Sequence, residues 1–171
     1  MTTTSKAQCA LISVYNKESL SDLATGLSSL GIAIIATGNT YKQLAQLGLA
    51  VTELSDYTNF PEIMDGRVKS LHPKIHGGIL ARQPQDKDTL LAHQIQPIDL
   101  VICNLYPFEQ TIKRPNCTTA EAIENIDIGG PTMIRAAAKN FNHVTVVTDP
   151  RDYPQLLDEL NRHGSTSLTT R

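Results

Sequence analysis

The chain has 171 residues, of which 40% are hydrophobic and 19% are charged. That length suits one globular domain with a single core and is short for two. Fifteen Lys and Arg residues stand against 17 Asp and Glu residues, which gives a formal net charge of -2. This balance excludes the broad basic field that binds a nucleic-acid backbone or an anionic membrane. Any anion must therefore bind at a local site.

The apolar runs and the cysteines indicate the cellular compartment of the protein. The longest apolar runs, 32–36 and 100–103, fall far short of the roughly 20 residues of a membrane helix. Residues 1–8 lack the apolar core of a secretory signal. The three cysteines, Cys9, Cys103 and Cys117, show neither CxxC nor Cys/His spacing, which favours reduced thiols and no metal site. We expect a cytoplasmic protein that binds neither membrane nor nucleic acid.

Short β-rich runs alternate with helical patterns along the chain. Strands are predicted at 9–14, 32–37, 51–54, 75–81, 100–105 and 143–148. Helices are predicted at 20–30, 40–47, 86–94, 119–125 and 131–140. Capping boxes are expected at Thr40 with Gln43 and at Thr118 with Glu121. Gly31 and Gly48 are typical left-handed residues after a helix. Strands separated by helices predict a single α/β domain over 1–171, with a mainly parallel sheet between helix layers.

The polar stretch from Ser55 to Lys74 is too long for an ordinary turn in so small a domain. It contains Phe60-Pro61-Glu62, Gly66-Arg67-Val68-Lys69 and His72-Pro73-Lys74. A disordered linker rarely carries so many anchoring residues, so this composition favours a functional loop.

Two adjacent strand ends can hold an anion. In open α/β sheets the ligand lies beyond the carboxyl ends of the strands, where helix N-termini point their N–H groups outward. The first strand runs into Ser13-Val14-Tyr15-Asn16-Lys17 and the second into Thr37-Gly38-Asn39-Thr40. Arg67 and Lys69 can add positive charge. The glycine turn alone has an ordinary structural explanation, whereas all four features together favour a phosphate site.

A second constellation lies nearer the C-terminus. Residues 104–108, Asn-Leu-Tyr-Pro-Phe, follow a predicted strand, and residues 127–131, Asp-Ile-Gly-Gly-Pro, open a helix that carries Arg135 and Lys139. The two glycines allow close backbone approach, and the N–H groups there can hold a developing oxyanion. Taken singly, a helix-start carboxylate, a half-buried Tyr106 and a surface Lys139 are the simpler explanations.

Together these segments closely resemble the N-terminal, cyclohydrolase half of the bifunctional purine biosynthesis enzyme AICAR transformylase/IMP cyclohydrolase. The segments are Ser13-Val14-Tyr15-Asn16-Lys17, Ala36-Thr37-Gly38-Asn39-Thr40, Gly66-Arg67-Val68-Lys69-Ser70-Leu71-His72-Pro73, His76-Gly77-Gly78-Ile79-Leu80-Ala81, Asn104-Leu105-Tyr106-Pro107-Phe108, Asp127-Ile128-Gly129-Gly130 and Arg135-Ala136-Ala137-Ala138-Lys139-Asn140. The resemblance spans nearly the whole chain. It implies a methylglyoxal-synthase-like fold with a Rossmann-like parallel sheet.

The same resemblance implies an enzyme, a hydrolase of purine biosynthesis. It would dehydrate and close the ring of 5-formamidoimidazole-4-carboxamide ribonucleotide (FAICAR) to give inosine monophosphate. The implied partners are these two purine nucleotides, no cofactor is implied, and a homodimer is compatible with it. Residues 164–168 resemble the point just before the family's next helix and its transformylase half. We therefore expect a domain truncated at its C-terminal end that lacks formyl transfer.

Site residues follow from the same comparison. The catalytic set is Lys69, Tyr106, Asp127 and Lys139. The nucleotide-binding set is Ser13, Tyr15, Asn16, Lys17, Thr37, Gly38, Asn39, Thr40, Arg67, Val68, Lys69, Ser70, Cys103, Asn104, Asp127, Ile128 and Gly129. The family commonly has a second glycine where this chain has Asn39, a residue that tolerates positive φ but places a side chain near the phosphate.

The expected mechanism assigns proton transfer to Lys139, stabilisation of the formyl oxygen to Lys69 and Tyr106, and orientation to Asp127. Two other functions remain open. A methylglyoxal synthase would share the phosphate turn and would recruit His72 or His76. A non-catalytic nucleotide-sensing module would need the phosphate site alone, and the presence of both lysines argues against it.

Overall fold

The computed structural model describes residues 6–171 of the chain. Its strands form one sheet in the order β3-β2-β1-β4-β5, and every neighbouring pair is parallel. The strands are β1 (Cys9–Val14), β2 (Ala33–Ala36), β3 (Val51–Glu53), β4 (Leu100–Asn104) and β5 (Thr145–Val147). The predicted α/β fold with a parallel sheet is confirmed.

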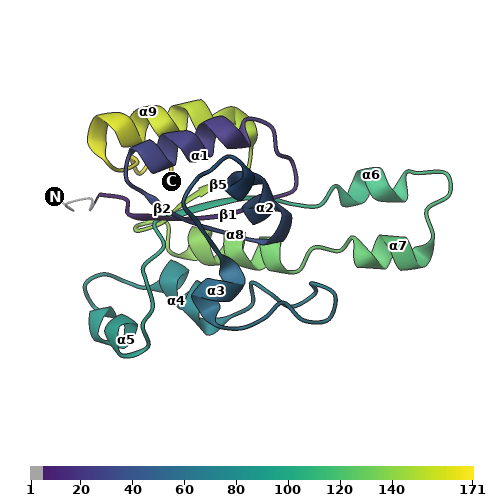
Figure 1. Ribbon diagram of the computed structural model, residues 1–171, viewed down its shortest axis with the longest axis horizontal. Helices are drawn as coiled ribbons and strands as arrows, with labels where there is room; N and C mark the ends of the chain where they lie inside the picture. The colour runs from purple at the N-terminus through teal and green to yellow at the C-terminus, as the bar shows by residue number, and fades with distance from the viewer. Residues whose placement is uncertain (1–5) are drawn as a thin grey trace.

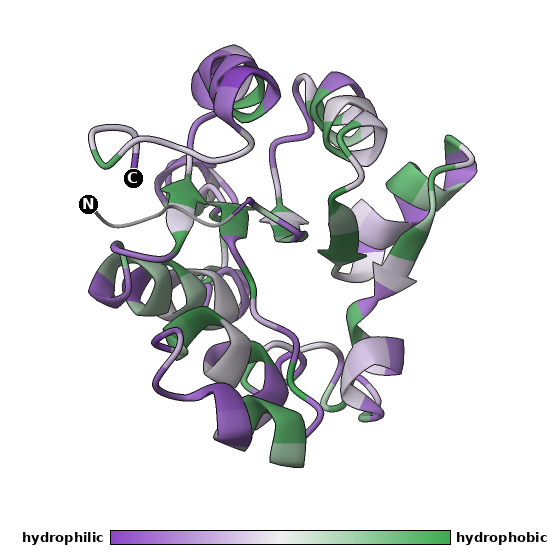
Figure 2. Cartoon of the chain, turned by 90° about the vertical axis from the view of Figure 1, so that its left-hand side faces the viewer, coloured by the Kyte–Doolittle hydropathy of each residue, from purple (hydrophilic) through white to green (hydrophobic). Residues whose placement is uncertain are grey.

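Helices cover both faces of this sheet (Figure 1). They are α1 (Leu20–Ser29), α2 (Gly38–Gln46), α3 (Leu54–Thr58), α4 (Pro73–Leu80), α5 (Lys87–Ala92), α6 (Phe108–Ile112), α7 (Thr119–Glu124), α8 (Gly129–Lys139), the short 3-10 helix η1 (Pro150–Asp152) and α9 (Tyr153–His163). Alternate residues of β1 explain the layers, because successive side chains of a strand point to opposite faces. Ala10 and Ile12 pack with α1, α2 and α9, whereas Cys9 and Leu11 pack with α3, α4 and α8. Hydrophobic residues accordingly gather on the central strands, with hydrophilic residues on the outer helices (Figure 2).

The strand predicted at 75–81 is wrong, because this segment is helix α4. Pro73 occupies the first turn, and the His72 side chain accepts a hydrogen bond from the Lys74 N–H at 3.2 Å. A short apolar run does not distinguish strand from buried helix. Gly78 also has a packing role, since a Cβ there would lie 2.6 Å from the backbone oxygen of Gln96.

Other local expectations had mixed outcomes. Thr118 and Glu121 form the predicted capping box, and Gly31 and Gly48 both have φ of 75°. The capping box at Thr40 is wrong: α2 begins at Gly38 with Thr37 as its N-cap. Helices α3, α6 and α9 were not predicted at all.

Helices α6 and α7 form an arm that projects from the domain (Figure 1). The two helices contact each other, and α7 contains no buried residue. The arm connects the end of β4 to the start of α8, so its root lies at the carboxyl edge of the sheet. Among residues 6–171, no helix is both long and apolar enough to cross a membrane.

Candidate functional site

The strand order reverses between β1 and β4, since β2 and β3 lie on one side of this pair and β5 on the other. Ligands of open parallel sheets bind at such a reversal, outside the carboxyl ends of the strands. A cleft of about 540 Å³ opens there. Of the predicted site residues it collects Ser13, Tyr15, Lys17, Thr37, Gly38, Asn39, Thr40, Arg67, Lys69, Ser70, Asn104, Tyr106, Asp127, Ile128 and Gly129.

Hydroxyl groups and a lysine meet where β1 and β2 end. The Ser13 and Thr37 hydroxyls are hydrogen-bonded at 2.9 Å. Lys17 Nζ donates to the Thr40 hydroxyl at 2.9 Å and also to the Val14 carbonyl. Burial lowers the pKa of Lys17. This end of the cleft adjoins the N-terminus of α2 and combines N–H groups, hydroxyls and an ammonium, the donors that an anion such as phosphate requires.

Gly38, the first residue of α2, has a φ of 40°. Asn39 follows it inside the helix and does not have a positive φ. The Asn39 side chain is exposed at the cleft, so this departure from the family pattern alters the lining and leaves the backbone of the turn intact.

The polar stretch after α3 reaches the cleft from the side. Arg67 Nη2 lies 3.3 Å from Glu124 Oε1 of the arm, and both side chains are largely exposed. Lys69 Nζ lies 3.6 Å from Glu62 Oε1, and the Lys69 side chain is 30% exposed. These two cations come from a segment far from Lys17 in sequence, yet they line the same cleft.

Asn104 organises the end of β4. Its side-chain oxygen accepts hydrogen bonds from the backbone N–H groups of Tyr15 at 2.7 Å and Asn16 at 2.8 Å, and its amide donates back to the Asn16 carbonyl. The rings of Tyr15 and Tyr106 pack edge to face, with centroids 5.5 Å apart. The two aromatic side chains thus form one wall above a fixed backbone turn.

The N-terminus of α8 also lines the cleft. Asp127 accepts a hydrogen bond from the Gly130 N–H at 2.8 Å. A Cβ on Gly129 would lie 2.3 Å from the Ser70 hydroxyl, so the glycine lets this hydroxyl approach the helix start. Burial, together with the nearby Asp127, raises the pKa of Cys103 to about 12. Cys103 therefore stays a neutral thiol beneath the cleft.

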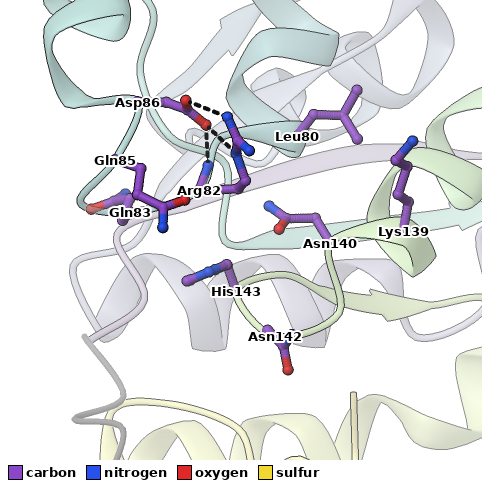
Figure 3. Close-up of a pocket in the computed structure, with 9 residues that line it drawn as sticks. All are labelled: Leu80, Arg82, Gln83, Gln85, Asp86, Lys139, Asn140, Asn142 and His143. Atoms are coloured by element: carbon purple, nitrogen blue, oxygen red, sulfur yellow. Dashed lines mark hydrogen bonds and ion pairs between the residues drawn. The ribbon is translucent and has the colours of Figure 1, made fainter.

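Four predicted residues do not line the cleft: Asn16, Val68, Cys103 and Lys139. The first three lie next to lining residues in sequence, but Lys139 is at the far end of α8. At 1.5 Å per residue, the ten residues from Gly129 correspond to about 15 Å. Lys139 instead borders a separate hollow of about 560 Å³ at the opposite edge of the sheet (Figure 3).

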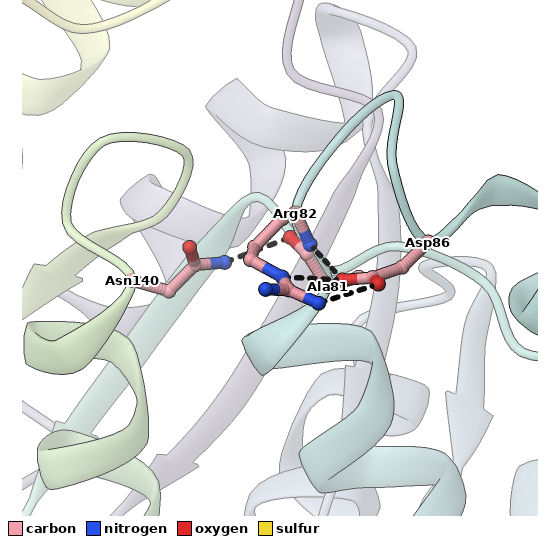
Figure 4. A network of polar contacts seen from close by, with 4 residues as sticks. All are labelled: Ala81, Arg82, Asp86 and Asn140. Atoms are coloured by element: carbon pink, nitrogen blue, oxygen red, sulfur yellow. Dashed lines mark hydrogen bonds and ion pairs between the residues drawn. The ribbon is translucent and has the colours of Figure 1, made fainter.

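That hollow has a structural anchor. The buried Asn140 side chain donates to the carbonyls of Ile79 at 2.8 Å and Ala81 at 2.9 Å, and Arg82 pairs with Asp86 beside it (Figure 4). The two hydrogen bonds of Asn140 join the C-terminal ends of α8 and α4. The segment 136–140 therefore has a clear role in packing.

Other lining residues were missed from the sequence. They are Asp65, Ile123, Glu124, Asn125, Ile126 and Met133, together with Val14, Gly66, Leu71 and Gly130, which belong to the quoted motifs but not to the predicted site. The signal for the arm residues was their position immediately before the Asp-Ile-Gly-Gly run. Neither His72 nor His76 lines the cleft: His72 caps α4, and burial lowers the pKa of His76. Among the described residues, no group of three His, Cys, Asp or Glu side chains is arranged to hold a metal.

The fold and the cleft define an α/β protein whose cleft lies at the carboxyl edge of a parallel sheet and is lined by hydroxyl groups, helix N-termini and cationic side chains. Residues 19–132 match the family model of the MGS-like domain, and residues 137–171 match that of the AICARFT/IMPCHase bienzyme. The chain belongs to the MGS-like domain family, and the two matches together are consistent with an IMP cyclohydrolase-type member. The chain is also similar to the protein in the crystal structure of ForH, with a TM-score of 0.82 and 37% identity over 94% of this chain and 83% of that chain.

Proposed function

We propose that this domain catalyses the cyclisation of FAICAR to inosine monophosphate. One observation supports the proposal: a single cleft brings Ser13, Lys17 and Thr37 at the ends of β1 and β2 together with Lys69, Tyr106 and Asp127, which come from three separate segments. A volume of about 540 Å³ lies within the range of small-molecule sites.

The reaction forms one carbon–nitrogen bond and releases water. The carboxamide nitrogen attacks the formyl carbon, and the formyl oxygen gains charge. That oxygen receives one proton from the attacking amide and a second from the formamide nitrogen, and it leaves as water. Both reacting groups belong to the same molecule, so correct positioning supplies several kcal/mol and acid–base assistance adds roughly 10²- to 10⁴-fold.

The cleft residues divide this work. In our proposal the phosphate binds to the hydroxyls near Ser13 and Thr37 with Lys17, and Arg67 adds charge at the rim. Lys69 and Tyr106 stabilise the formyl oxygen as it gains charge and relay to it the protons that the two nitrogens lose.

Asp127, held by its bond to the Gly130 N–H, orients the carboxamide. The chemistry requires no cofactor.

Lys139 does not fit this scheme within its own chain, because it lies about 9 Å along α8 beyond Met133, the last residue of this helix that lines the cleft. We propose that Lys139, if catalytic, serves the cleft of a second copy. Mixing inactive Lys69→Met and Lys139→Met variants would then restore activity, since a mixed dimer contains one intact site. Full activity of Lys139→Met alone would make it a surface lysine. If that variant is inactive, failure of the mixture would contradict the shared site.

To test the proposed activity, the protein is incubated with FAICAR and, in a separate reaction, with dihydroxyacetone phosphate. We expect an ultraviolet spectrum of inosine monophosphate from the first and no methylglyoxal from the second, because neither His72 nor His76 lines the cleft. Methylglyoxal production would favour the synthase. Nucleotide binding without any product would favour a sensing module.

A further inference from the structure

The segment after α3 forms a small hairpin with a strained turn. Ile63 and Val68 make an antiparallel bridge, and each N–H donates to the other's carbonyl. Three consecutive residues between them, Met64, Asp65 and Gly66, have positive φ values of 55°, 53° and 86°. Such conformations are unfavourable for residues other than glycine and cluster at functional sites. The fold therefore maintains this turn despite a local cost.

The register of the hairpin places Glu62 opposite Lys69. Each residue lies one position outside the bridged pair, and opposite residues of an antiparallel pair have adjacent side chains. The carboxylate of Glu62 lies 2.3 Å from the position of a Cβ on Gly66, so it occupies the space that this glycine leaves open. Lys69 Nζ lies 3.6 Å from that carboxylate.

The ammonium of Lys69 also lies close to the start of α2. Its Nζ is 3.9 Å from the position of a Cβ on Gly38 and 3.4 Å from that of a Cβ on Gly66. The ammonium thus sits between the hairpin turn and the helix N-terminus. An ammonium has three N–H donors, so pairing with Glu62 on one side leaves donors for a ligand.

We propose that Glu62 is a positioning residue for Lys69, an inference that rests on the proposed function. Glu62 does not line the cleft, and it acts through the lysine. A free lysine side chain loses rotamer entropy when a ligand fixes it. The cross-strand carboxylate restricts the side chain beforehand and keeps Nζ above the cleft, which favours the aligned geometry that ring closure needs.

The test compares Glu62→Gln, which keeps the shape and removes the charge, with Asp158→Asn, which makes the same change in an exposed pair with Arg162 on α9. We expect kcat to fall on the order of 10-fold or more in Glu62→Gln, with KM within a few-fold. Glu62→Asp should recover part of the loss, and Asp158→Asn should behave as wild type. A purely structural role would lower the melting temperature and leave kcat unchanged, which would overturn the proposal.

A double-mutant cycle shows whether Glu62 acts through Lys69. Glu62→Gln should lower kcat in the wild type and have no further effect in Lys69→Met, because the group it positions is absent. Equal losses in both backgrounds would contradict the proposal.

The same cycle is measured for inosine monophosphate affinity, so that it remains informative if the wild type does not cyclise FAICAR. Absence of product would reject the proposed function. Glu62→Gln should weaken affinity by up to a few-fold in the wild type and leave it unchanged in Lys69→Met, and equal effects in both backgrounds would reject the positioning role.

Discussion

The ion pair between Arg67 and Glu124, two residues that line the cleft, joins the hairpin to the arm. We predict that a nucleotide phosphate competes with Glu124 for this arginine. The two charged groups lie 3.3 Å apart, and their side chains are 62% and 60% exposed. An exposed pair of this kind contributes about 0.2–1 kcal/mol. Ligand binding must give up that amount before Arg67 can contact phosphate.

We expect opposite changes in inosine monophosphate affinity for variants of the two residues. Glu124→Gln releases Arg67 and should tighten inosine monophosphate binding by about 1.4- to 5-fold, the equivalent of about 0.2–1 kcal/mol. Arg67→Ala removes a charge-assisted hydrogen bond worth about 1.5–3 kcal/mol and should weaken binding by about 10- to 150-fold.

Calorimetric titration with inosine monophosphate measures both effects, and binding by wild type should weaken as salt is added. The matched control is Glu109→Gln, which removes the charge from an exposed pair with Lys113 elsewhere on the arm. Weaker binding by Glu124→Gln would refute the competition. Unchanged affinity of Arg67→Ala would remove this residue from the site.

Two further predictions concern the scaffold. The Arg82 side chain lowers the pKa of Asp86 to about 2, so the stability from this pair is present above the unfolded pKa and is lost as pH falls through the folded value. Asp86→Asn should therefore flatten the acid dependence of the unfolding free energy between about pH 5 and pH 2. Urea titrations at several pH values measure this free energy, and the same dependence on pH in wild type and variant would contradict the prediction. Gly78→Ala places a Cβ 2.6 Å from the Gln96 carbonyl and should cost about 1–3 kcal/mol of stability without changing nucleotide affinity. An unaltered melting temperature would show that the backbone yields more easily than the packing implies.

Much of the fold could be predicted because local patterns and tertiary packing agree. The apolar spacing of Leu20, Leu23 and Leu27 predicts α1, and all three side chains are buried. The strand prediction at 75–81 is wrong because the eight residues of α4, with two glycines near the middle, do not show a clear helical period of apolar side chains. Helix α9 was missed although Leu156 and Leu160 lie on its buried face, since no segment of the resemblance covered it.

The convergence of the site could not be predicted from the residues alone. The strand order decides that Lys17, Lys69 and Tyr106 meet, and no local pattern contains that order. Motif continuity was misleading for Lys139, because one helix joins it to Gly129 and yet separates the two by about 15 Å. The pairing of Glu62 with Lys69 depends on a hairpin register that only the structure supplies.

The most direct test of the central claim is the rate of FAICAR ring closure by wild type and by Lys69→Met. Methionine keeps most of the aliphatic stem and removes the ammonium. We predict that wild type produces inosine monophosphate well above the uncatalysed rate. Lys69→Met should lose on the order of 10² or more in turnover while it still binds the product. Equal rates for the two proteins would place the chemistry outside this cleft and contradict the account.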